Sequence, residues 1–257
     1  MRFCSLGSGS EGNALLIESE TDGRCVRLLI DCGFGLREFR RRLARLQLAP
    51  ESIDAILVTH EHGDHIGGAP RIAAAHGIAL YMTEGTARAG LDKPAETLFH
   101  AIDSHAGFEI AGVWIEPVPV PHDAREPVQF VIDDGKHRLG VLTDLGHPTP
   151  HVIRAMSRLD AIVLECNHDA QMLEQSSYPY TLKRRIGGDY GHLANHASAQ
   201  LLAAIDHDRL RTVVAAHLSR SNNLPELARE ALAGAWGQDP EKILVADQDQ
   251  GLSWIAV

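Results

Sequence analysis

This sequence lacks any apolar run that approaches the roughly 18 residues of a membrane span, and its N-terminus lacks the long apolar core of a signal peptide. We therefore expect a cytoplasmic protein that has no membrane as a partner. The sequence also lacks a Pro/Gly/Ser-rich linker, an internal repeat and a low-complexity tract. With 257 residues, it is expected to form a single domain over residues 1–257.

Paired cysteines and an excess of positive charge are missing as well. The four cysteines, Cys4, Cys25, Cys32 and Cys166, form no CxxC pair, and we interpret them as small, reduced core residues. Lys and Arg number 24 against 34 Asp and Glu, which gives a formal net charge of −10. That balance is not typical of a general nucleic-acid-binding protein.

Histidine, by contrast, is abundant, with 15 residues, and it concentrates in the stretch 59–65, THEHGDH. The apolar run 55–58 before it predicts a buried strand, and Gly63 allows a sharp turn. Because residues two apart in extended backbone point to the same side, His60 and His62 can face one cation. Asp64 and His65 can present a second set of ligands beyond the turn. Imidazole with carboxylate suits zinc, manganese or iron, which favours a metal site over an exposed histidine-rich loop.

Other candidate ligands also follow predicted strands. His122 comes after the strand expected at 113–120, Asp144 after 137–142 and His217 after 212–216. A lone His or Asp is normally structural, but side chains just past several strands converge at one edge of a sheet. We therefore expect the metals at the edge where the loops carrying His60, His122, Asp144 and His217 meet.

Strands and helices alternate along the chain, with hairpins between them. This order predicts an α/β fold in which two stacked sheets carry helices on the outside, an αββα sandwich. Helices are expected at 36–48, 69–76, 149–157, 196–205 and 224–235. Strands are expected at 26–30, 55–58, 78–82, 113–120, 129–133, 137–142, 161–164, 212–216, 242–246 and 252–257, after a strand–turn–strand unit at 2–18.

Two polar segments leave alternatives open. The Gly/Ser turn at 7–13 lacks a GK[ST] ending and a following helix, so a tight hairpin is favoured over a phosphate-cradling loop. The expected helix 36–48 carries five arginines, which we interpret as a solvated face, with a track for a polyanion as the alternative. These residues are Arg37, Arg40, Arg41, Arg42 and Arg45.

The HxHxDH signature at 60–65 resembles that of the metallo-β-lactamase-fold hydrolases. The resemblance implies a metallo-β-lactamase-type αββα sandwich with two divalent metal ions, zinc or manganese, with iron also compatible. It implies that His60, His62 and His122 hold the first metal, that Asp64, His65 and His217 hold the second, and that Asp144 bridges them. Asp64 is expected to be a catalytic residue as well as a metal ligand. A bridging hydroxide, formed because metal lowers the pKa of water to about 7, would be the nucleophile.

Further segments are most similar to the YycJ/WalJ-type DNA exonuclease family. They are Ser5–Ser10 with Gly12 and Asn13, Pro121–Ala124, Thr143–Gly146, and Tyr178-Pro179 with Leu182-Lys183. The resemblance extends to Asn223, with a departure at Ala194, where serine is expected. It implies a metal-dependent 5′-to-3′ exonuclease on double-stranded DNA that is linked to repair and to repair partners. It also implies that His192 is the general acid, oriented by Glu165; the alternative is a helix-capping or core histidine.

Substrate contacts are expected from Lys183, Arg184 and Arg185, which lie shortly before His192, and from Asn195 and Ser219. Two other functions remain open. One is a small-molecule metallo-hydrolase acting on a phosphodiester, thioester or lactone, for which the basic residues 183–185 would be dispensable. The other is a non-catalytic regulatory metal-binding protein, which a rate assay would separate from an enzyme.

Overall fold

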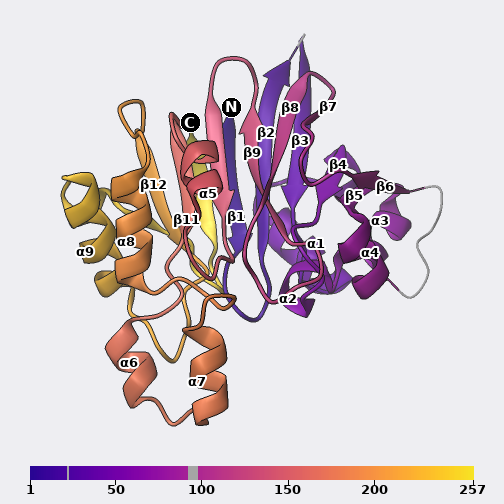
Figure 1. The fold of residues 1–257 in the computed structure, drawn as a ribbon. Helices are drawn as coiled ribbons and strands as arrows, with labels where there is room; N and C mark the ends of the chain where they lie inside the picture. The colour runs from indigo at the N-terminus through magenta and orange to yellow at the C-terminus, as the bar shows by residue number, and fades with distance from the viewer. Residues whose placement is uncertain (22, 92–97) are drawn as a thin grey trace.

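The first of two mixed sheets contains most of the N-terminal half of the chain (Figure 1). The computed structural model describes residues 1–21, 23–91 and 98–257. Within them, the first sheet has the order β14 (Leu252–Ala256), β1 (Arg2–Gly7), β2 (Ala14–Thr21), β3 (Arg24–Ile30), β4 (Ala55–Leu57), β5 (Ala79–Thr83) and β6 (Phe99–Ile102). Strands β3 to β6 run parallel to one another, so their carboxyl ends share one edge.

The second sheet comes from the C-terminal half. Its order is β13 (Leu244–Val245), β12 (Thr212–Ala216), β11 (Ala161–Glu165), β10 (Arg138–Leu142), β9 (Val128–Asp133), β8 (Val113–Pro119) and β7 (Phe108–Ile110). Strands β10 to β13 are parallel, whereas β7, β8 and β9 form antiparallel pairs. The carboxyl ends of β10, β11 and β12 therefore meet at a second shared edge.

Helices cover the outer faces of both sheets (Figure 1). On the first sheet lie α1 (Leu36–Ala44), α2 (Gly63–Ile66), α3 (Ala69–His76) and α4 (Glu84–Gly90); on the second lie α5 (Pro150–Ala155), α8 (Asn195–Ala204) and α9 (Pro225–Trp236). The short helices α6 (Ala170–Gln175) and α7 (Tyr180–Ile186) project below the second sheet. The expected αββα sandwich is confirmed. No helix among the described residues has both the length and the apolar character that crossing a membrane requires.

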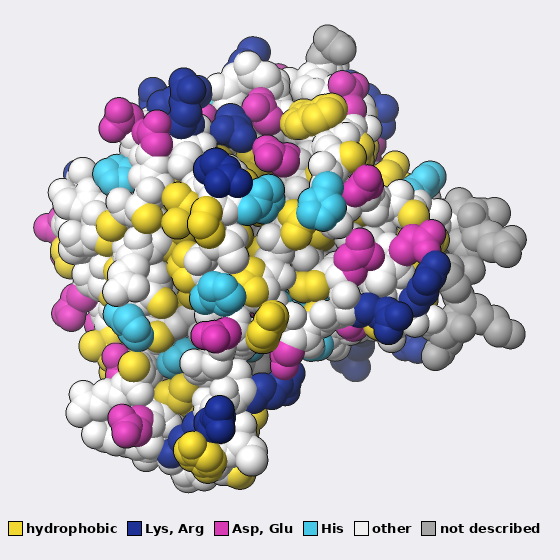
Figure 2. All heavy atoms as spheres, in the orientation of Figure 1, with side chains coloured by type: hydrophobic (Ala, Val, Ile, Leu, Met, Phe, Trp, Pro, Cys, Tyr) yellow, Lys and Arg dark blue, Asp and Glu magenta, His cyan; other side chains and the backbone are white. Residues whose placement is uncertain are grey.

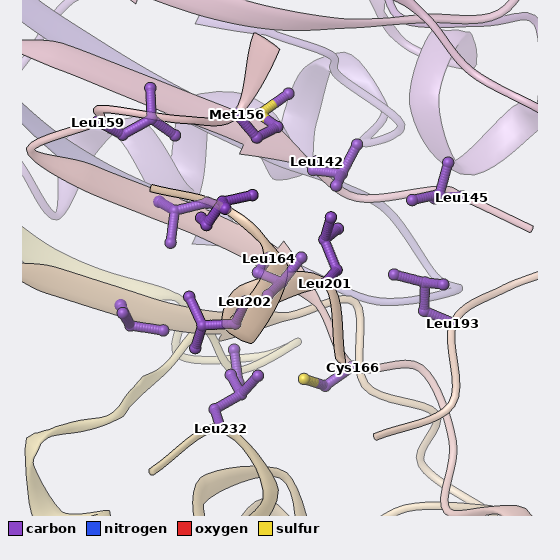
Figure 3. Packing of buried hydrophobic residues seen from close by; sticks show 14 of the residues in the cluster. Leu142, Leu145, Met156, Leu159, Leu164, Cys166, Leu193, Leu201, Leu202 and Leu232 are labelled. Atoms are coloured by element: carbon purple, nitrogen blue, oxygen red, sulfur yellow. The ribbon is translucent and has the colours of Figure 1, made fainter. Parts of the chain in front are cut away.

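The alternation of side chains along each strand produces three apolar layers. In β2, Ile17 faces the layer between the sheets with Phe130 of β9, while its neighbour Leu16 faces the outer layer with Phe39 of α1. Because both faces of these strands are buried, the strands read as continuous apolar runs rather than as alternating ones. On the far side, Leu202 of α8 belongs to the cluster that packs on the second sheet (Figure 3).

Several local expectations need correction. Helix α1 ends at Ala44, four residues before the predicted end, and helix α6 was not predicted. Strand β13 covers only Leu244–Val245, because a short 3₁₀ helix occupies Pro240–Lys242. The Gly/Ser segment does join the hairpin of β1 and β2, as predicted.

The arginine run on α1 is not wholly a solvated face. Arg42 is buried, and its guanidinium donates hydrogen bonds to the carbonyl oxygens of Leu6 (2.6 Å) and Gln248 (2.8 Å). It also lies over the Phe34 ring, 4.1 Å from the ring centroid. One arginine therefore connects α1 to the end of β1 and to the turn before β14.

We predict that Arg42→Met lowers the free energy of unfolding by about 2–4 kcal/mol, because two or more buried carbonyl groups lose their donor. The matched control is Arg37→Met, an exposed arginine on the same helix, which should change stability by less than about 0.5 kcal/mol. Urea denaturation of both variants measures the difference. Equal stability of the two variants would show that Arg42 has no structural role.

Candidate metal centre

The predicted ligands come together at the edge where the two sheets present the carboxyl ends of their parallel strands. The histidine-rich stretch follows β4, Asp144 follows β10, and His217 follows β12 directly. His122 comes from the loop after β8. Parallel strands place their carboxyl ends at the same edge, so residues more than 150 positions apart, such as Asp64 and His217 (153 apart), become neighbours.

One group consists of three imidazoles. The nitrogen His62 Nδ1 lies 3.0 Å from His60 Nε2 and 3.2 Å from His122 Nε2. The outer nitrogens of two rings are occupied, since His60 Nδ1 is 3.0 Å from the Thr59 hydroxyl and His122 Nδ1 is 3.0 Å from the carbonyl oxygen of Gly191. The inner nitrogens thus converge on one point, as ligands held by outer hydrogen bonds do.

The second group contains one carboxylate and two imidazoles. Asp64 Oδ2 lies 3.3 Å from His65 Nε2 and 3.3 Å from His217 Nε2. Asp64 sits in the first turn of α2, where the helix N-terminus favours a negative charge. These three side chains can share one cation, and ligand atoms from each lie within 4.8 Å of one another.

Asp144 lies between the two groups. Its Oδ2 is 3.0 Å from His65 Nε2, while its Oδ1 is 3.5 Å from His217 Nδ1 and 3.8 Å from His122 Nε2. The carboxylate is only 1% exposed. Although His65 Nε2 is near, Asp144 Oδ2 forms no hydrogen bond of good geometry with any described residue. An unsatisfied carboxylate oxygen facing several imidazoles is the position expected of a bridging ligand.

This donor set fits divalent metal ions. Zinc–nitrogen bonds of about 2.0–2.1 Å in tetrahedral geometry place the ligand nitrogens about 3.3 Å apart. The separations of 3.0 and 3.2 Å between the imidazole nitrogens of the first group are close to that value. Without a cation or extra protons, those lone pairs would repel each other, so the arrangement favours a metal.

An aspartate that the sequence analysis passed over positions one of these ligands. Asp31, directly after β3, has Oδ2 2.8 Å from His65 Nδ1, and it accepts hydrogen bonds from both the backbone N–H and the hydroxyl of Thr59. A Cβ at Gly33 would come within 2.1 Å of the Asp64 carbonyl oxygen, so this loop needs glycine to pack against α2. Asp31 follows a strand just as Asp144 does, and that signal could have identified it.

The Gly/Ser hairpin loop also reaches the centre, which the sequence did not predict. Asn13 Nδ2 lies 3.1 Å from His65 Nε2 and 3.3 Å from Asp64 Oδ2. The hydroxyl of Ser8 accepts a hydrogen bond of 2.9 Å from the backbone N–H of His217. The loop therefore helps to hold the second group of ligands in place.

Glu165 and His192 form the predicted pair. Glu165, the last residue of β11, is fully buried, and its Oε1 is 2.7 Å from His192 Nδ1 and 3.3 Å from His217 Nδ1. Its other oxygen accepts hydrogen bonds from the backbone N–H groups of Leu145 and Leu193. These contacts fix the orientation of the His192 ring. The contact with Glu165 uses Nδ1 and does not involve Nε2.

The histidines of the site fall into two groups, one with a lowered pKa and one with a raised pKa. Burial, and then the charge of His65, hold the pKa of His60 well below its usual value. Burial also acts to lower the pKa of His65, but the charges of Asp144 and Asp31 raise it well above the usual value. For His192, burial is likewise outweighed by the Glu165 charge and the hydrogen bonds of both carboxylates, which raise the pKa to about 10.

The carboxylates respond in the opposite direction. Burial acts to raise the pKa of Asp144, yet the charges of His217 and His65 hold it well below its usual range. The pKa of Asp64 is also lowered, because hydrogen bonds with His217 and His65 outweigh its burial. Both carboxyl groups are therefore ionised at neutral pH, as the predicted ligand role requires.

Two of the loops at the site contain strained backbone. Asp31 and His217, each directly after a parallel strand, have φ values of 59° and 56°. Non-glycine residues seldom occupy this left-handed region, and doing so costs on the order of 1 kcal/mol or more. The packed strands around them hold these residues in place and turn both side chains toward the centre.

The predicted substrate residues fall into different surroundings. Arg185 Nε lies 2.6 Å from an oxygen of Asp123, whose other oxygen is 3.7 Å from His62 Nε2. Lys183 donates to the Glu174 carbonyl oxygen (2.6 Å), while the guanidinium of Arg184 lies 6.0 Å from the centroid of the Tyr180 ring. Figure 2 shows Lys and Arg side chains together with hydrophobic ones on the protrusion formed by α6 and α7.

Asn195 and Ser219 are engaged within the protein. The amide of Asn195 exchanges hydrogen bonds of 2.8 and 2.9 Å with Asn223, and the Asn195 side chain is buried. The hydroxyl of Ser219 accepts a hydrogen bond of 3.2 Å from the backbone N–H of Asn222. Their expected contacts with substrate remain predictions.

Comparison with known proteins gives a consistent result. Residues 26–218 match the family model described as beta-lactamase superfamily domain. Exodeoxyribonuclease WalJ of Streptococcus pneumoniae is 33% identical over 244 residues, covering 92% of this chain and 88% of that protein. Exodeoxyribonuclease YycJ of Bacillus anthracis is 31% identical over 239 residues, covering 91% and 88%. Zn²⁺-bound PqqB of Methylobacterium extorquens has the same fold, with a TM-score of 0.75, 18% identity and full coverage of both chains.

We predict that Asp31→Asn weakens metal binding by about 10–100-fold, the usual effect of removing an outer carboxylate from a ligating histidine. Asparagine keeps the shape and tolerates the positive φ, so the fold should persist. The control is Asp54→Asn, a partly buried aspartate away from the site that pairs with the Arg24 side chain and accepts a hydrogen bond from the backbone N–H of Arg27. Competition with a chelator measures both affinities, and unchanged affinity in Asp31→Asn would remove its positioning role.

Proposed function

The chain belongs to the beta-lactamase superfamily and, within it, to the hydrolase family of the WalJ and YycJ exodeoxyribonucleases, and we propose that it degrades double-stranded DNA from an end in the 5′-to-3′ direction. The observation that carries this proposal is the convergence of all seven predicted ligands at one sheet edge, in a chain related to those exonucleases over nine tenths of its length. Two divalent ions, zinc or manganese, with iron also compatible, are the proposed cofactors.

The chain's residues have separable tasks in this reaction. His60, His62 and His122 would hold one ion, Asp64, His65 and His217 the other, and Asp144 would contact both. When bound, such ions supply Lewis acidity, which lowers the pKa of a water to about 7 and neutralises charge on a phosphate. The ligand carboxylates and outer hydrogen bonds keep the centre rigid, which favours precise placement of the phosphodiester.

His192 is the proposed general acid. Its Nδ1 is committed to Glu165 at 2.7 Å, so protonated His192 can donate only from Nε2. The raised pKa, about 10, keeps the ring protonated at neutral pH. Proton donation to the leaving oxygen would then stabilise the alkoxide that forms when the P–O bond breaks.

DNA binding must rest on local contacts, because the net charge of −10 provides no long-range attraction. Lys183, Arg184 and Arg185 of α7, together with Asn195 and Ser219, are the proposed substrate contacts. Arg185 also links α7 to Asp123 beside the proposed ligands. Arg185 would therefore help to position α7 as well as contact the substrate. We propose DNA repair in the cytoplasm, with repair proteins as partners, as the setting of this activity.

The acidic charge favours one alternative, a small-molecule phosphodiesterase. Such an enzyme would use the same metal centre and the same acid, but it would not need a basic α7. A p-nitrophenyl phosphodiester and a linear duplex, compared at matched concentrations, separate the two functions. Good cleavage of the small diester together with no cleavage of DNA would favour the alternative.

We predict that linear duplex DNA labelled at a 5′ end releases its label as short products in the presence of manganese or zinc, and releases none with a chelator. The same duplex labelled at a 3′ end should lose its label only late in the reaction. Covalently closed circular DNA, which has no ends, is the control and should stay intact. Early loss of the 3′ label, or cutting of the circle, would contradict the proposal.

We predict that His192→Ala lowers kcat for DNA by about 10²–10⁴-fold, the usual range for loss of a general acid, while metal content stays close to that of the wild type. His151→Ala, which removes an exposed histidine of α5, is the control. Steady-state kinetics and elemental analysis give the two readouts. Loss of metal from the His192 variant would make His192 a ligand, and an unchanged rate would make it structural.

A further inference from the structure

A cavity of about 770 Å³ lies between the α6–α7 hairpin and the start of α8. In Figure 1, α6 and α7 project at the lower left of the molecule, and α8 lies above them beside the second sheet. His192 is one of its lining residues, so the cavity opens directly onto the proposed catalytic acid. Its volume is in the range of sites that bind small molecules or parts of larger substrates.

His168 in the cavity wall has an unexplained feature. The residue is only 3% exposed, yet its Nδ1 has no hydrogen-bond partner among the described residues. Its backbone is fixed, since its carbonyl oxygen accepts a hydrogen bond of 2.9 Å from the Asn195 N–H and it forms a β-bridge with Ala194. A buried polar atom without a partner costs stability, so packing alone does not explain why this imidazole is held in the cavity wall.

The surroundings keep the His168 ring neutral. Burial lowers the pKa of His168 to about 4, although the charge of Glu165 acts in the opposite direction. A neutral imidazole has one donor and one acceptor nitrogen. One of these nitrogens can pair with a single donor or acceptor on the edge of a nucleobase.

The other lining residues fit a nucleotide as well. Leu173 and Ala197 supply apolar walls, while Tyr180, which is 72% exposed, supplies an aromatic face at the rim. Lys183 and Arg184 also line the cavity and carry positive charge. Aromatic faces combined with basic side chains are typical of sites for unpaired nucleic acid, where bases stack and phosphates are neutralised.

We propose that this cavity is a subsite for one unpaired nucleobase of the substrate strand, next to the bond that is cut, and that His168 hydrogen-bonds the edge of that base. The proposal rests on the proposed exonuclease function, which it deepens. A base inside the cavity cannot remain in the duplex stack. The terminal base pair must therefore open before cleavage, as in enzymes that extrude their target nucleotide.

The first test compares linear duplexes that differ only in the terminal pair of the cleaved end, either G·C or a mismatch. Opening costs least where the pair is already mismatched. The wild-type protein, loaded with manganese, should cleave the mismatched end at least about tenfold faster. His168→Ala should lose much of the activity on both ends. Equal wild-type rates on the two ends would contradict the proposal.

The second test fills the cavity. Ala170 is an exposed lining residue at the start of α6, and its neighbour Gln171 is exposed but does not line the cavity. Ala170→Trp should lower the ratio of DNA cleavage to p-nitrophenyl phosphodiester cleavage by about tenfold, whereas Gln171→Trp should keep the wild-type ratio. An unchanged ratio in Ala170→Trp, in a variant whose unfolding is normal, would overturn the subsite.

A binding measurement reports on the base itself. A duplex with 2-aminopurine at the cleaved end and an uncleavable terminal linkage should become more fluorescent with metal-loaded wild-type protein, because the base leaves its stack. The increase should be absent with Ala170→Trp and retained with Gln171→Trp. DNA cleavage without any increase would overturn only the subsite, whereas absence of both cleavage and binding would overturn the proposed exonuclease function.

Discussion

The buried carboxylate of Asp144 is the constraint on which the rest of the site depends. It is 1% exposed and lies within 3.0–3.8 Å of nitrogens of four histidines, three of them predicted ligands and the fourth His192. A buried anion without compensation is strongly unfavourable, and removal of a partner from such a cluster leaves an uncompensated charge. Two further carboxylates lie on the outer side of these imidazoles. Asp31 holds the far nitrogen of His65, whereas Glu165 contacts His192 Nδ1, the same nitrogen that lies 3.2 Å from Asp144. Carboxylates and imidazoles therefore alternate outward from the centre.

This alternation requires the sandwich fold, and it explains where the backbone is strained. The two sheets contribute their parallel strand ends to one edge, and the loop after each strand has only a few residues in which to turn a side chain inward. At Asp31 and His217 the turn is made with a left-handed residue that is not glycine. Such a conformation persists only where the surroundings determine it fully, and here the strands on both sides are buried in apolar layers. The rigidity of the sheets is thus what holds the charged cluster together.

The sequence predicted the candidate metal ligands better than it predicted the residues that hold those ligands in place. The HxHxDH stretch is local, and the rule that strand ends converge was enough to place His122, Asp144 and His217 with it. The residues that hold the ligands in place could not be predicted in the same way, because Arg42 and Asn13 act through contacts with residues far away in the chain. Arg42 illustrates the limit: within its helix it is indistinguishable from its arginine neighbours, and only tertiary packing buries it. The unpartnered nitrogen of His168 is likewise a property of three-dimensional surroundings, and the expected single domain and cytoplasmic location stay predictions.

An acidic protein that acts on DNA must avoid contact along most of the duplex. With a net charge of −10, a long interface over the outer surface would be repelled, and the repulsion would grow with the number of phosphates in contact. Contacts confined to the metal centre, α7 and the adjoining cavity involve few phosphates. An end of the strand would meet all three while most of the duplex stays away from the protein surface. The charge that argues against a general DNA-binding protein is therefore consistent with an enzyme that engages DNA only at its ends.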